Sequence, residues 1–387
     1  MSAAALLGLL ALAIWLYLLL ARGGFWLARE RDDRDLPPEP ARWPAVVAVV
    51  PARNEAEVIA EAVGSLLRQD YPGSFRVVLV DDGSDDGTAE RAREAARALG
   101  AAGRLEVLQG EPLPPGWTGK LWAMRQGVAR ATEAGAPPEY LLFTDADIGH
   151  APDNLRALVA RAEQGGRALV SLMAELSCVT RAERFLIPAF VFFFQMLYPF
   201  AWVARRERAL AAAAGGCMLV RRTALEAAGG IASIRAEIID DCALGRRLKA
   251  QGPIWLGLTR RARSLRPYHS LAEIGRMVSR SAYAQLGYSP LLLAGTLAGM
   301  VLTYLAPPAL ALFGTGLARI SGLAAWALMA LAFQPMLRFY RVSPLWGLAL
   351  PAIGAAYALF TLQSALQVWR GRGGQWKGRA QAMAGRV

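Results

Sequence analysis

The sequence predicts an α/β domain built on a mainly parallel sheet and flanked by membrane-spanning helices. Through the middle of the chain, short apolar runs alternate with Ala-, Glu- and Arg-rich segments, which is the pattern of a parallel sheet covered by helices. Both ends carry long apolar stretches. Of the 387 residues, 55% are hydrophobic, whereas soluble domains have roughly 45–50%. An ordinary soluble protein is therefore excluded.

The first apolar stretch, residues 3–21, is about long enough to cross the ~30 Å hydrocarbon core of a bilayer. A signal peptide would begin with a basic segment, and none precedes this run. Arginines follow it instead, at Arg22, Arg29, Arg31 and Arg34. We therefore expect a retained anchor over 1–22 and, by the positive-inside rule, a cytoplasmic continuation. The charged, proline-rich part of residues 23–44 predicts a linker.

A globular domain is expected over residues 45–285. Its predicted strands are 46–50, 75–80, 105–109, 140–144 and 167–175. Helical stretches such as 55–69 and 88–100 lie between them. Sheets of this kind bind ligands beyond the carboxyl ends of their strands. The residues that directly follow each strand are therefore the candidates for a site.

The apolar pattern returns in residues 286–369. Candidate spans are 290–313, 317–337 and 345–368, and a basic tail, 370–387, follows them. One N-terminal anchor plus three such spans would place this tail outside, against the positive-inside rule. Either one candidate re-enters the membrane or the number of spans differs by one.

Residues 185–204 are also apolar enough to cross a membrane, but we expect this segment to lie at the membrane surface. A span here would separate the acidic residues before it from those after it, although both groups are expected to form one site. Its two prolines and its aromatic residues suit an interfacial element, as do the flanking Arg184, Arg205 and Arg206.

The net charge of +12 points to an anionic membrane surface. The basic residues are spread among membrane-flanking arginines rather than gathered in one patch with aromatic residues, which argues against nucleic-acid binding. The three cysteines form no CxxC pair and no zinc-type spacing. A disulfide framework and a structural zinc are therefore not expected.

Acidic residues follow two of the predicted strands. The segment 81–88, DDGSDDGT, suits a turn and a helix cap equally well as a ligand site. Asp145 and Asp147 follow the strand 140–144 and offer the hard oxygen ligands that suit Mg²⁺ or Mn²⁺. His150 follows this pair and is placed to approach a metal there, but we expect it to lie at the surface. No P-loop and no GxGxxG motif is present, which excludes those two ways of holding phosphates.

Two further pairs of residues, one acidic and one of glycines, are candidates for the site. Asp240 and Asp241 stand before the helical run ALGRRLKAQG. They are either helix-capping residues or a general base that takes a proton from a hydroxyl. Gly215 and Gly216 either form a turn or let the backbone approach a ligand closely.

Taken together, these motifs resemble one family. PARNE, VDDGSDDGT, TDADI, GGCMLVRR and IDDCALGRRL occur in this order. They are similar to the motifs of inverting family 2 glycosyltransferases, which have a GT-A fold, a Rossmann-like arrangement. The resemblance covers roughly residues 45–285. The membrane layout, the WTGKLWA segment and the tail resemble the hopene-associated glycosyltransferases, and members of ceramide glucosyltransferase or carotenoid-modifying type have a similar architecture.

The resemblance implies a role for each matching residue. Contacts to the nucleotide-sugar are implied for Pro51, Arg53, Glu55, Asp82, Lys120 and Asp145. Of these, Glu55 and Asp82 would contact the uracil and ribose of a UDP-sugar, and a solvated loop position for Lys120 is an equal alternative. Asp147, with Asp145, would hold the divalent cation (Mg²⁺ or Mn²⁺). Asp241 would be the catalytic base, preceded by the acidic Asp240. Gly215 and Gly216 would lie on the acceptor side.

The sequence departs from the family at one place. Many membrane-bound members carry QxxRW after the acidic pair, but here the nearest match is residues 277–281, where only Arg280 agrees. The missing tryptophan argues against a polysaccharide synthase.

The resemblance thus implies transfer of one sugar from a UDP-sugar to a membrane lipid, with hopanoid-related lipids the expected acceptors. We expect a multi-pass protein of the cell inner membrane with its catalytic domain on the cytoplasmic side. A nucleotidyltransferase would need a Gly-rich triphosphate loop, which PARNEAE lacks. The alternative outside catalysis is a membrane scaffold that has the same fold but no activity. Every acidic position of the motifs still carries an acidic residue, which argues against this alternative.

Overall fold

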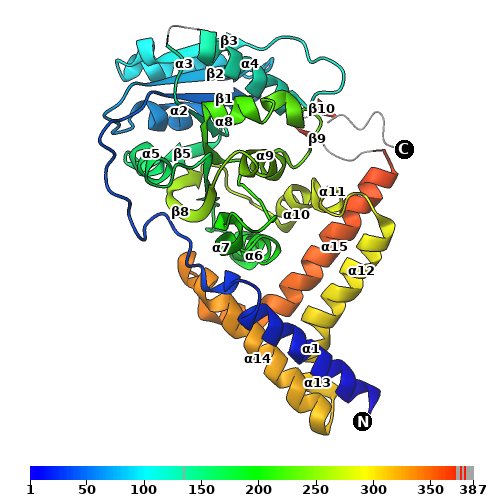
Figure 1. Cartoon of the computed structure of the whole chain (residues 1–387). Helices are drawn as coiled ribbons and strands as arrows, with labels where there is room; N and C mark the ends of the chain where they lie inside the picture. The colour runs from blue at the N-terminus through cyan, green and yellow to red at the C-terminus, as the bar shows by residue number, and fades with distance from the viewer. Residues whose placement is uncertain (134–135, 372–374, 377–378, 381–387) are drawn as a thin grey trace. The chain divides into compact units, whose positions relative to one another are not determined.

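The computed structural model describes residues 1–133, 136–371, 375–376 and 379–380 (Figure 1). These residues form two compact units. The helical unit contains residues 1–29, 178–201 and the helices that follow residue 266. The sheet unit is made mainly of residues 30–177 and 202–266. The domain limits expected from the sequence, at 44 and 285, stay predictions.

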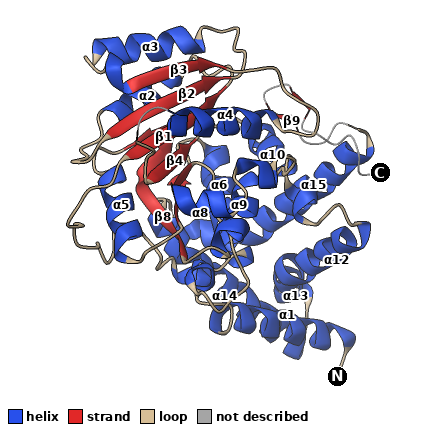
Figure 2. Cartoon of the chain, turned by 45° about the horizontal axis from the view of Figure 1, so that its top comes forward, coloured by secondary structure: helices blue, strands red, loops and turns tan. Residues whose placement is uncertain are grey.

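The sheet unit is built on eight hydrogen-bonded strands in the order β3-β2-β1-β4-β7-β6-β8-β5. Strands β3, β2, β1 and β4 lie side by side in Figure 2. The strands are β1 (Val46–Ala52), β2 (Phe75–Asp81), β3 (Leu105–Gln109), β4 (Tyr140–Thr144), β5 (Ile148–His150), β6 (Leu169–Glu175), β7 (Cys217–Arg221) and β8 (Ile254–Ser264). All five strands expected from the sequence are present. A separate antiparallel pair joins β9 (Gln375–Trp376) to β10 (Arg379–Ala380).

The prediction of a mainly parallel sheet is correct for one half of it. Strands β3, β2, β1 and β4 run parallel, with Val46 of β1 opposite Phe75 of β2 and Tyr140 of β4. In the other half, β7 runs antiparallel to both β4 and β6. Strand β5 also pairs antiparallel with β8. The sheet is therefore mixed, because β7 and β5, which the sequence analysis did not predict as strands, run antiparallel to their neighbours, while β6 and β8 pair in parallel.

Helices cover both faces of the parallel half. The helices and 3₁₀ turns of this unit are α2 (Ile59–Leu67), α3 (Thr88–Ala98), η2 (Ala102–Arg104), α4 (Gly119–Glu133), α5 (Asn154–Gln164), α8 (Arg222–Ala227), η3 (Ile231–Ile234) and α9 (Asp240–Lys249). Ala48 and Val50 of β1 belong to the core that includes residues of α2, α3 and α5. Helix α4 packs on the other face, where a Cβ at Gly127 would come within 2.4 Å of Val49 Cγ1. Burial of β1 on both faces explains why its residues form an uninterrupted apolar run.

The helical unit contains long apolar helices. Its elements are α1 (Ala3–Leu20), η1 (Phe25–Leu27), α6 (Arg181–Leu197), α10 (Leu271–Ser279), α11 (Ala282–Gln285), α12 (Pro290–Met300), the π-helical turn η4 (Val301–Leu305), α13 (Ala306–Phe313), α14 (Gly316–Phe339), η5 (Pro344–Ala349) and α15 (Leu350–Trp369). Four helical stretches among the described residues are long and apolar enough to cross a membrane: Ala3–Leu20, Pro290–Phe313, Gly316–Phe339 and Pro344–Trp369. These coincide closely with the four apolar stretches of the sequence. The basic tail lies largely outside the described residues.

The segment 185–204 forms most of α6 and all of α7 (Phe200–Ala204). Helix α6 begins with a capping box in which Thr180 and Glu183 bind each other's backbone N–H groups. At its other end, Arg22 donates to the carbonyl oxygens of Met196 at 3.1 Å and Leu197 at 3.2 Å. Those carbonyls belong to the last turn of the helix, where no intrahelical donor is available. The location of this segment at the membrane surface stays a prediction.

Candidate active site

The acidic motifs meet at one edge of the sheet unit. Parallel strands β1, β2 and β4 end at the same edge, so the residues that follow them are neighbours. Lys120, in the first turn of α4, joins two of these motifs. Its Nζ lies 2.9 Å from Asp145 Oδ1 and 3.1 Å from Asp240 Oδ2. The DxD pair and the acidic pair at the start of α9 therefore belong to one cluster, although they are 95 positions apart in the chain (145 to 240).

The backbone contacts at the start of α4 fix the position of Lys120. The Thr118 hydroxyl accepts a hydrogen bond from Leu121 N at 3.4 Å, and Thr118 N donates to the Arg235 carbonyl at 2.9 Å. Only 16% of the Lys120 side chain is exposed. Burial lowers the pKa of Lys120, but the charges of Asp145 and Asp240 outweigh it and raise the pKa above its ordinary value. Lys120 is therefore an ammonium at neutral pH, and its interpretation as a solvated loop lysine is wrong.

Asp241 is fixed by two backbone donors. Gly215 N donates to its Oδ2 at 3.0 Å, and Cys242 N donates to its Oδ1 at 2.7 Å. Burial, with the neighbouring charge of Asp240, raises the pKa of Asp241 to about 6. Lys120 and the two N–H donors pull the pKa the other way, but less strongly. The result is a carboxylate that is ionised at neutral pH and more basic than an ordinary aspartate.

The two glycines before β7 form one side of this cluster. A Cβ at Gly215 would lie 3.4 Å from Lys120 Nζ and 3.5 Å from Asp241 Oδ2. A side chain there would thus enter the space beside both charges. Gly216 accepts a hydrogen bond from Thr144 Oγ1 at 2.8 Å, which ties the glycine turn to the end of β4.

The PARNE and DDGSDDGT loops are bound to each other. Asn54 N donates to Ser84 Oγ at 3.0 Å, and Glu55 N donates to Thr88 Oγ1 at 2.9 Å. Asp86 accepts from Ala56 N at 2.9 Å. Part of the acidic loop therefore serves to join the loops that follow β1 and β2.

Other residues of these loops form the strand ends at this edge. Arg53, which follows β1, donates to the Asp82 carbonyl, and its Nη1 lies 3.8 Å from Asp82 Oδ2. Asp82 is 2% exposed and Glu55 is 7% exposed. Pro51 lies within β1, opposite Val80 of β2. The residues expected to contact the nucleotide are thus gathered at the ends of adjacent strands.

Arg266 is a member of the cluster that the sequence interpretation missed. It forms an ion pair with Glu55, and its Nε lies 3.6 Å from Asp147 Oδ2. The residue comes two positions after β8, whose Ser264 is opposite Ile148 of β5. The only sequence signal is an arginine close to a strand end, and the strand IWLGLTRRARS is itself hard to recognise because it contains three arginines.

The donor set suits a divalent cation that also binds phosphate. Asp145 and Asp147 side chains are 36% and 28% exposed, so both carboxylates are accessible. Among the described residues, no group of three or more His, Cys, Asp or Glu side chains is arranged to hold a metal. A Mg²⁺ or Mn²⁺ ion would therefore complete its shell with water and substrate phosphates, as is usual for Mg²⁺.

His150 lies in the core, and its predicted surface position is wrong. It is 6% exposed, and its ring nitrogens lie 2.9 Å from Thr144 Oγ1 and 2.9 Å from Asn154 Nδ2. Burial lowers the pKa of His150 to about 4. The residue belongs to β5, which the sequence interpretation did not identify, and it acts as a neutral hydrogen-bonding side chain between β4 and α5.

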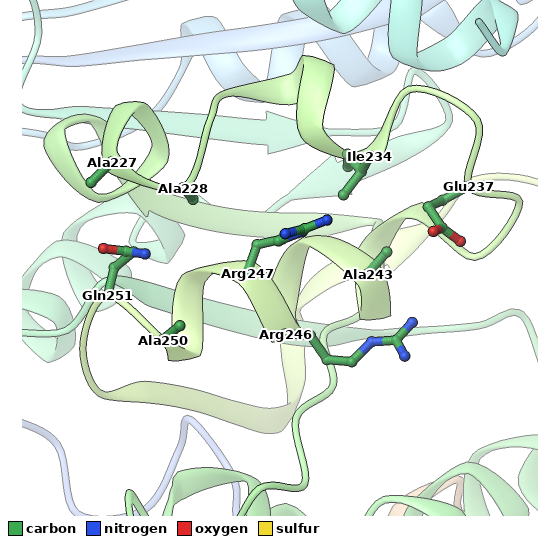
Figure 3. A pocket seen from close by; sticks show the side chains of 9 residues that line it. All are labelled: Ala227, Ala228, Ile234, Glu237, Ala243, Arg246, Arg247, Ala250 and Gln251. Atoms are coloured by element: carbon green, nitrogen blue, oxygen red, sulfur yellow. The ribbon is translucent and has the colours of Figure 1, made fainter. Parts of the chain in front are cut away.

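A pocket of about 550 Å³ lies along another part of α9 (Figure 3). Its lining residues are Ala227, Ala228, Ile234, Glu237, Ala243, Arg246, Arg247, Ala250 and Gln251. None of the carboxylates described above lines it. Figure 3 shows Arg246 and Arg247 of α9 among the side chains that line it. This pocket is therefore distinct from the acidic cluster.

Part of the chain is similar to known glycosyltransferases. Residues 47–229 match the family model "Glycosyl transferase family 2". An N-acetylglucosaminyltransferase of Rhizobium leguminosarum bv. viciae is 28% identical over 191 residues, which cover 47% of this chain and 40% of that protein. An N-acetylglucosaminyltransferase of Mesorhizobium japonicum is 28% identical over 204 residues, 49% of this chain and 42% of that protein. The chain thus spans about two fifths of the length of these relatives.

A solved structure shares the fold. The mannosyltransferase PcManGT from Pyrobaculum calidifontis, in complex with GDP-Man and Mn²⁺, is 21% identical with a TM-score of 0.54. The superposition covers 94% of this chain and 99% of that one. The likeness to this structure concerns the fold, and the mixed sheet fits the expected GT-A fold.

Proposed function

We propose that this chain, with its family 2 glycosyltransferase domain, is a membrane-bound inverting enzyme that transfers a single sugar from a nucleotide-sugar to a lipid hydroxyl. The observation that carries the proposal is the position of Lys120, whose ammonium contacts both Asp145 and Asp240. It brings the carboxylates suited to a metal–diphosphate group next to a carboxylate suited to act as a base. A sugar-transfer reaction needs both groups at one site.

Asp241 would act as the base. The acceptor hydroxyl would attack the anomeric carbon while Asp241 takes the hydroxyl proton, and the bond from that carbon to the diphosphate oxygen would break. Attack opposite the leaving group inverts the anomeric centre. The Gly215 and Cys242 amides hold the carboxylate in one orientation, and its pKa of about 6 keeps it ionised yet basic at neutral pH.

Asp145 and Asp147 would hold a divalent cation, which when bound neutralises charge on the departing nucleotide diphosphate. Lys120 would keep Asp145 oriented from the other side. At the nucleoside end, Glu55 and Asp82 would face the base and ribose, with Arg53 and Pro51 forming the strand end beneath them. We propose a UDP-sugar as the donor, and a GDP-sugar is the competing donor because the mannosyltransferase with the same fold binds GDP-Man.

The apolar helices favour a lipid acceptor. Four helical stretches have the length and composition of membrane spans, and a lipid hydroxyl would reach the enzyme from the bilayer. We propose the cell inner membrane as the location, with the sheet unit in the cytoplasm, because arginines follow the first span. A hopanoid-related acceptor is proposed from the motif resemblance, and ceramide or carotenoid lipids are the alternatives within this class.

The test uses the full chain reconstituted in nanodiscs with Mn²⁺ and a lipid extract of the source cells. UDP-glucose, UDP-N-acetylglucosamine and GDP-mannose are supplied separately. We expect release of the nucleotide diphosphate and one lipid species heavier by one hexose or N-acetylhexosamine, measured by mass spectrometry. Asp241→Asn is the inactive control. Donor binding without any transfer to lipid, across all donors, would favour the non-catalytic scaffold.

A further inference from the structure

Each carboxylate of the Asp145–Asp147 pair faces a cation of the chain itself. Lys120 Nζ is 2.9 Å from Asp145, and Arg266 Nε is 3.6 Å from Asp147. Arg266 also pairs with Glu55, at the other end of the expected donor site. The pair is therefore charge-compensated without any bound metal.

The backbone fixes Arg266 beside the acidic pair. Strand β5 begins directly after Asp147 and runs antiparallel to the end of β8, with Ile148 opposite Ser264. Leu265 N donates to the carbonyl of Asp147 at 2.8 Å. The next residue is Arg266, so its side chain starts close to the DxD turn and extends to Glu55.

The two cations are held with different strength. Lys120 is 16% exposed and is shared with Asp240 at 3.1 Å. The Arg266 side chain is 31% exposed, its Nε makes no hydrogen bond with any described residue, and its contact with Asp147 exceeds hydrogen-bond length. Asp147 is therefore the looser of the two contacts of Arg266, whereas Lys120 is held between two carboxylates at once.

We propose that Arg266 is a positioning residue. In the donor-free protein it neutralises the charge of Asp147, and it moves away from Asp147 when the divalent metal binds there. The proposal rests on the metal-binding role given to Asp147 in the proposed function. A metal ion and a guanidinium that approach the same carboxylate repel each other, so they compete for it. Because the same guanidinium holds Glu55, one side chain connects the metal end of the site to its nucleoside end.

The experiment measures Mn²⁺ binding alone, without nucleotide or acceptor, to the full chain in detergent micelles. Free Mn²⁺ is followed by electron paramagnetic resonance. Removing the competitor in Arg266→Gln should tighten Mn²⁺ binding about two- to five-fold, the range expected for loss of one partly exposed ion pair. Arg266→Lys keeps the charge and should bind Mn²⁺ as the unmodified chain does. The matched control is Arg263→Gln, three positions earlier, which removes an exposed arginine paired with Glu61.

Unchanged or weaker Mn²⁺ binding in Arg266→Gln, in protein that elutes as a folded species, overturns the proposal. So does a tightening of the same size in Arg266→Lys or in Arg263→Gln. In an Asp147→Asn background the effect of Arg266→Gln should vanish. If the unmodified chain binds Mn²⁺ and Arg266→Gln does not change that binding, only the competition between Arg266 and the metal is rejected. If neither the unmodified chain nor any variant binds Mn²⁺, the metal-binding role of Asp147 is rejected as well.

Discussion

The backbone amide of Gly215 donates a hydrogen bond of 3.0 Å to Oδ2 of Asp241. This contact joins the turn before β7 to the first residues of α9, so the orientation of the expected base depends on a glycine 26 positions earlier in the chain. Cys242 N holds the other oxygen at 2.7 Å. The two donors fix the orientation of the carboxylate and favour its ionised form.

Replacing Asp241 by Asn should separate chemistry from binding. The amide is nearly isosteric, so folding and nucleotide affinity should survive, while transfer should fall by the roughly 10²–10⁴-fold typical of a positioned base. Diphosphate release and calorimetric donor affinity are measured together. Glu237→Gln, on the exposed loop before α9, is the matched control. Near-normal turnover in Asp241→Asn would reassign the residue to a helix cap.

The rate of transfer should depend on pH through Asp241. Only the ionised carboxylate accepts a proton, and its pKa is raised to about 6 by burial and by Asp240. The rate constant kcat/KM should therefore rise with pH, reach half its limit near pH 6 and level off above pH 7. A profile that stays flat from pH 5 to pH 8 contradicts the assignment of this group as the base.

Replacing Lys120 by Met should destabilise the sheet unit. The change leaves Asp145 and Asp240 near each other without their shared cation. Because Asp145 is partly exposed, the cost should lie between the ~1 kcal/mol of an exposed pair and the ~3–5 kcal/mol of a fully buried one. The measurement is the midpoint of thermal unfolding. Adding Asp240→Asn to Lys120→Met should recover part of the loss, because one of the two facing charges is then gone. Equal stability of Lys120→Met and the unmodified chain would mean that the ammonium is not buried in this cluster.

His150 should make stability depend on pH. Its folded pKa of about 4 lies below the value of about 6.5 for an unfolded histidine, so the unfolded chain takes up the proton first. The stabilisation of the folded state that comes from the neutral ring is fully present above pH 6.5. It is lost as the pH falls toward 4, so the free energy of unfolding decreases by about 2 kcal/mol between pH 7 and pH 5. Thermal unfolding of His150→Gln, compared with the unmodified chain at both pH values, isolates this contribution from that of Asp241. Identical pH dependence in the two proteins would contradict it.

The segment 185–204 should keep both of its flanks on one side of the membrane. Cysteines placed at Val179 and Glu207, in a chain without Cys178, should react with an impermeant maleimide only after the cells are opened. The reason is that the carboxylates before and after this segment form one cluster through Lys120. Labelling of one flank in intact cells and of the other only in opened cells would reject the single-side arrangement.

The amino-acid sequence by itself determined the five strands that have apolar, β-branched residues, the apolar membrane-type helices and the acidic residues at the ends of β2 and β4. These features are local: a run of apolar residues, or a carboxylate next to it, is visible within about ten positions. The motif order also indicated a family 2 glycosyltransferase domain, and residues 47–229 match the model of that family.

Tertiary structure alone decided the remaining features. Strand β5 has three residues and β8 carries arginines, so neither has the apolar pattern by which strands are recognised. Their pairing brings Arg266 to Asp147, a separation of 119 positions (147 to 266), and the fold of α4 brings Lys120 between Asp145 and Asp240. Burial likewise decided that His150 is a core residue and that Asp241 is unusually basic. These properties depend on which distant groups share a low-dielectric environment, and that is set by the packing of the chain rather than by the order of its residues.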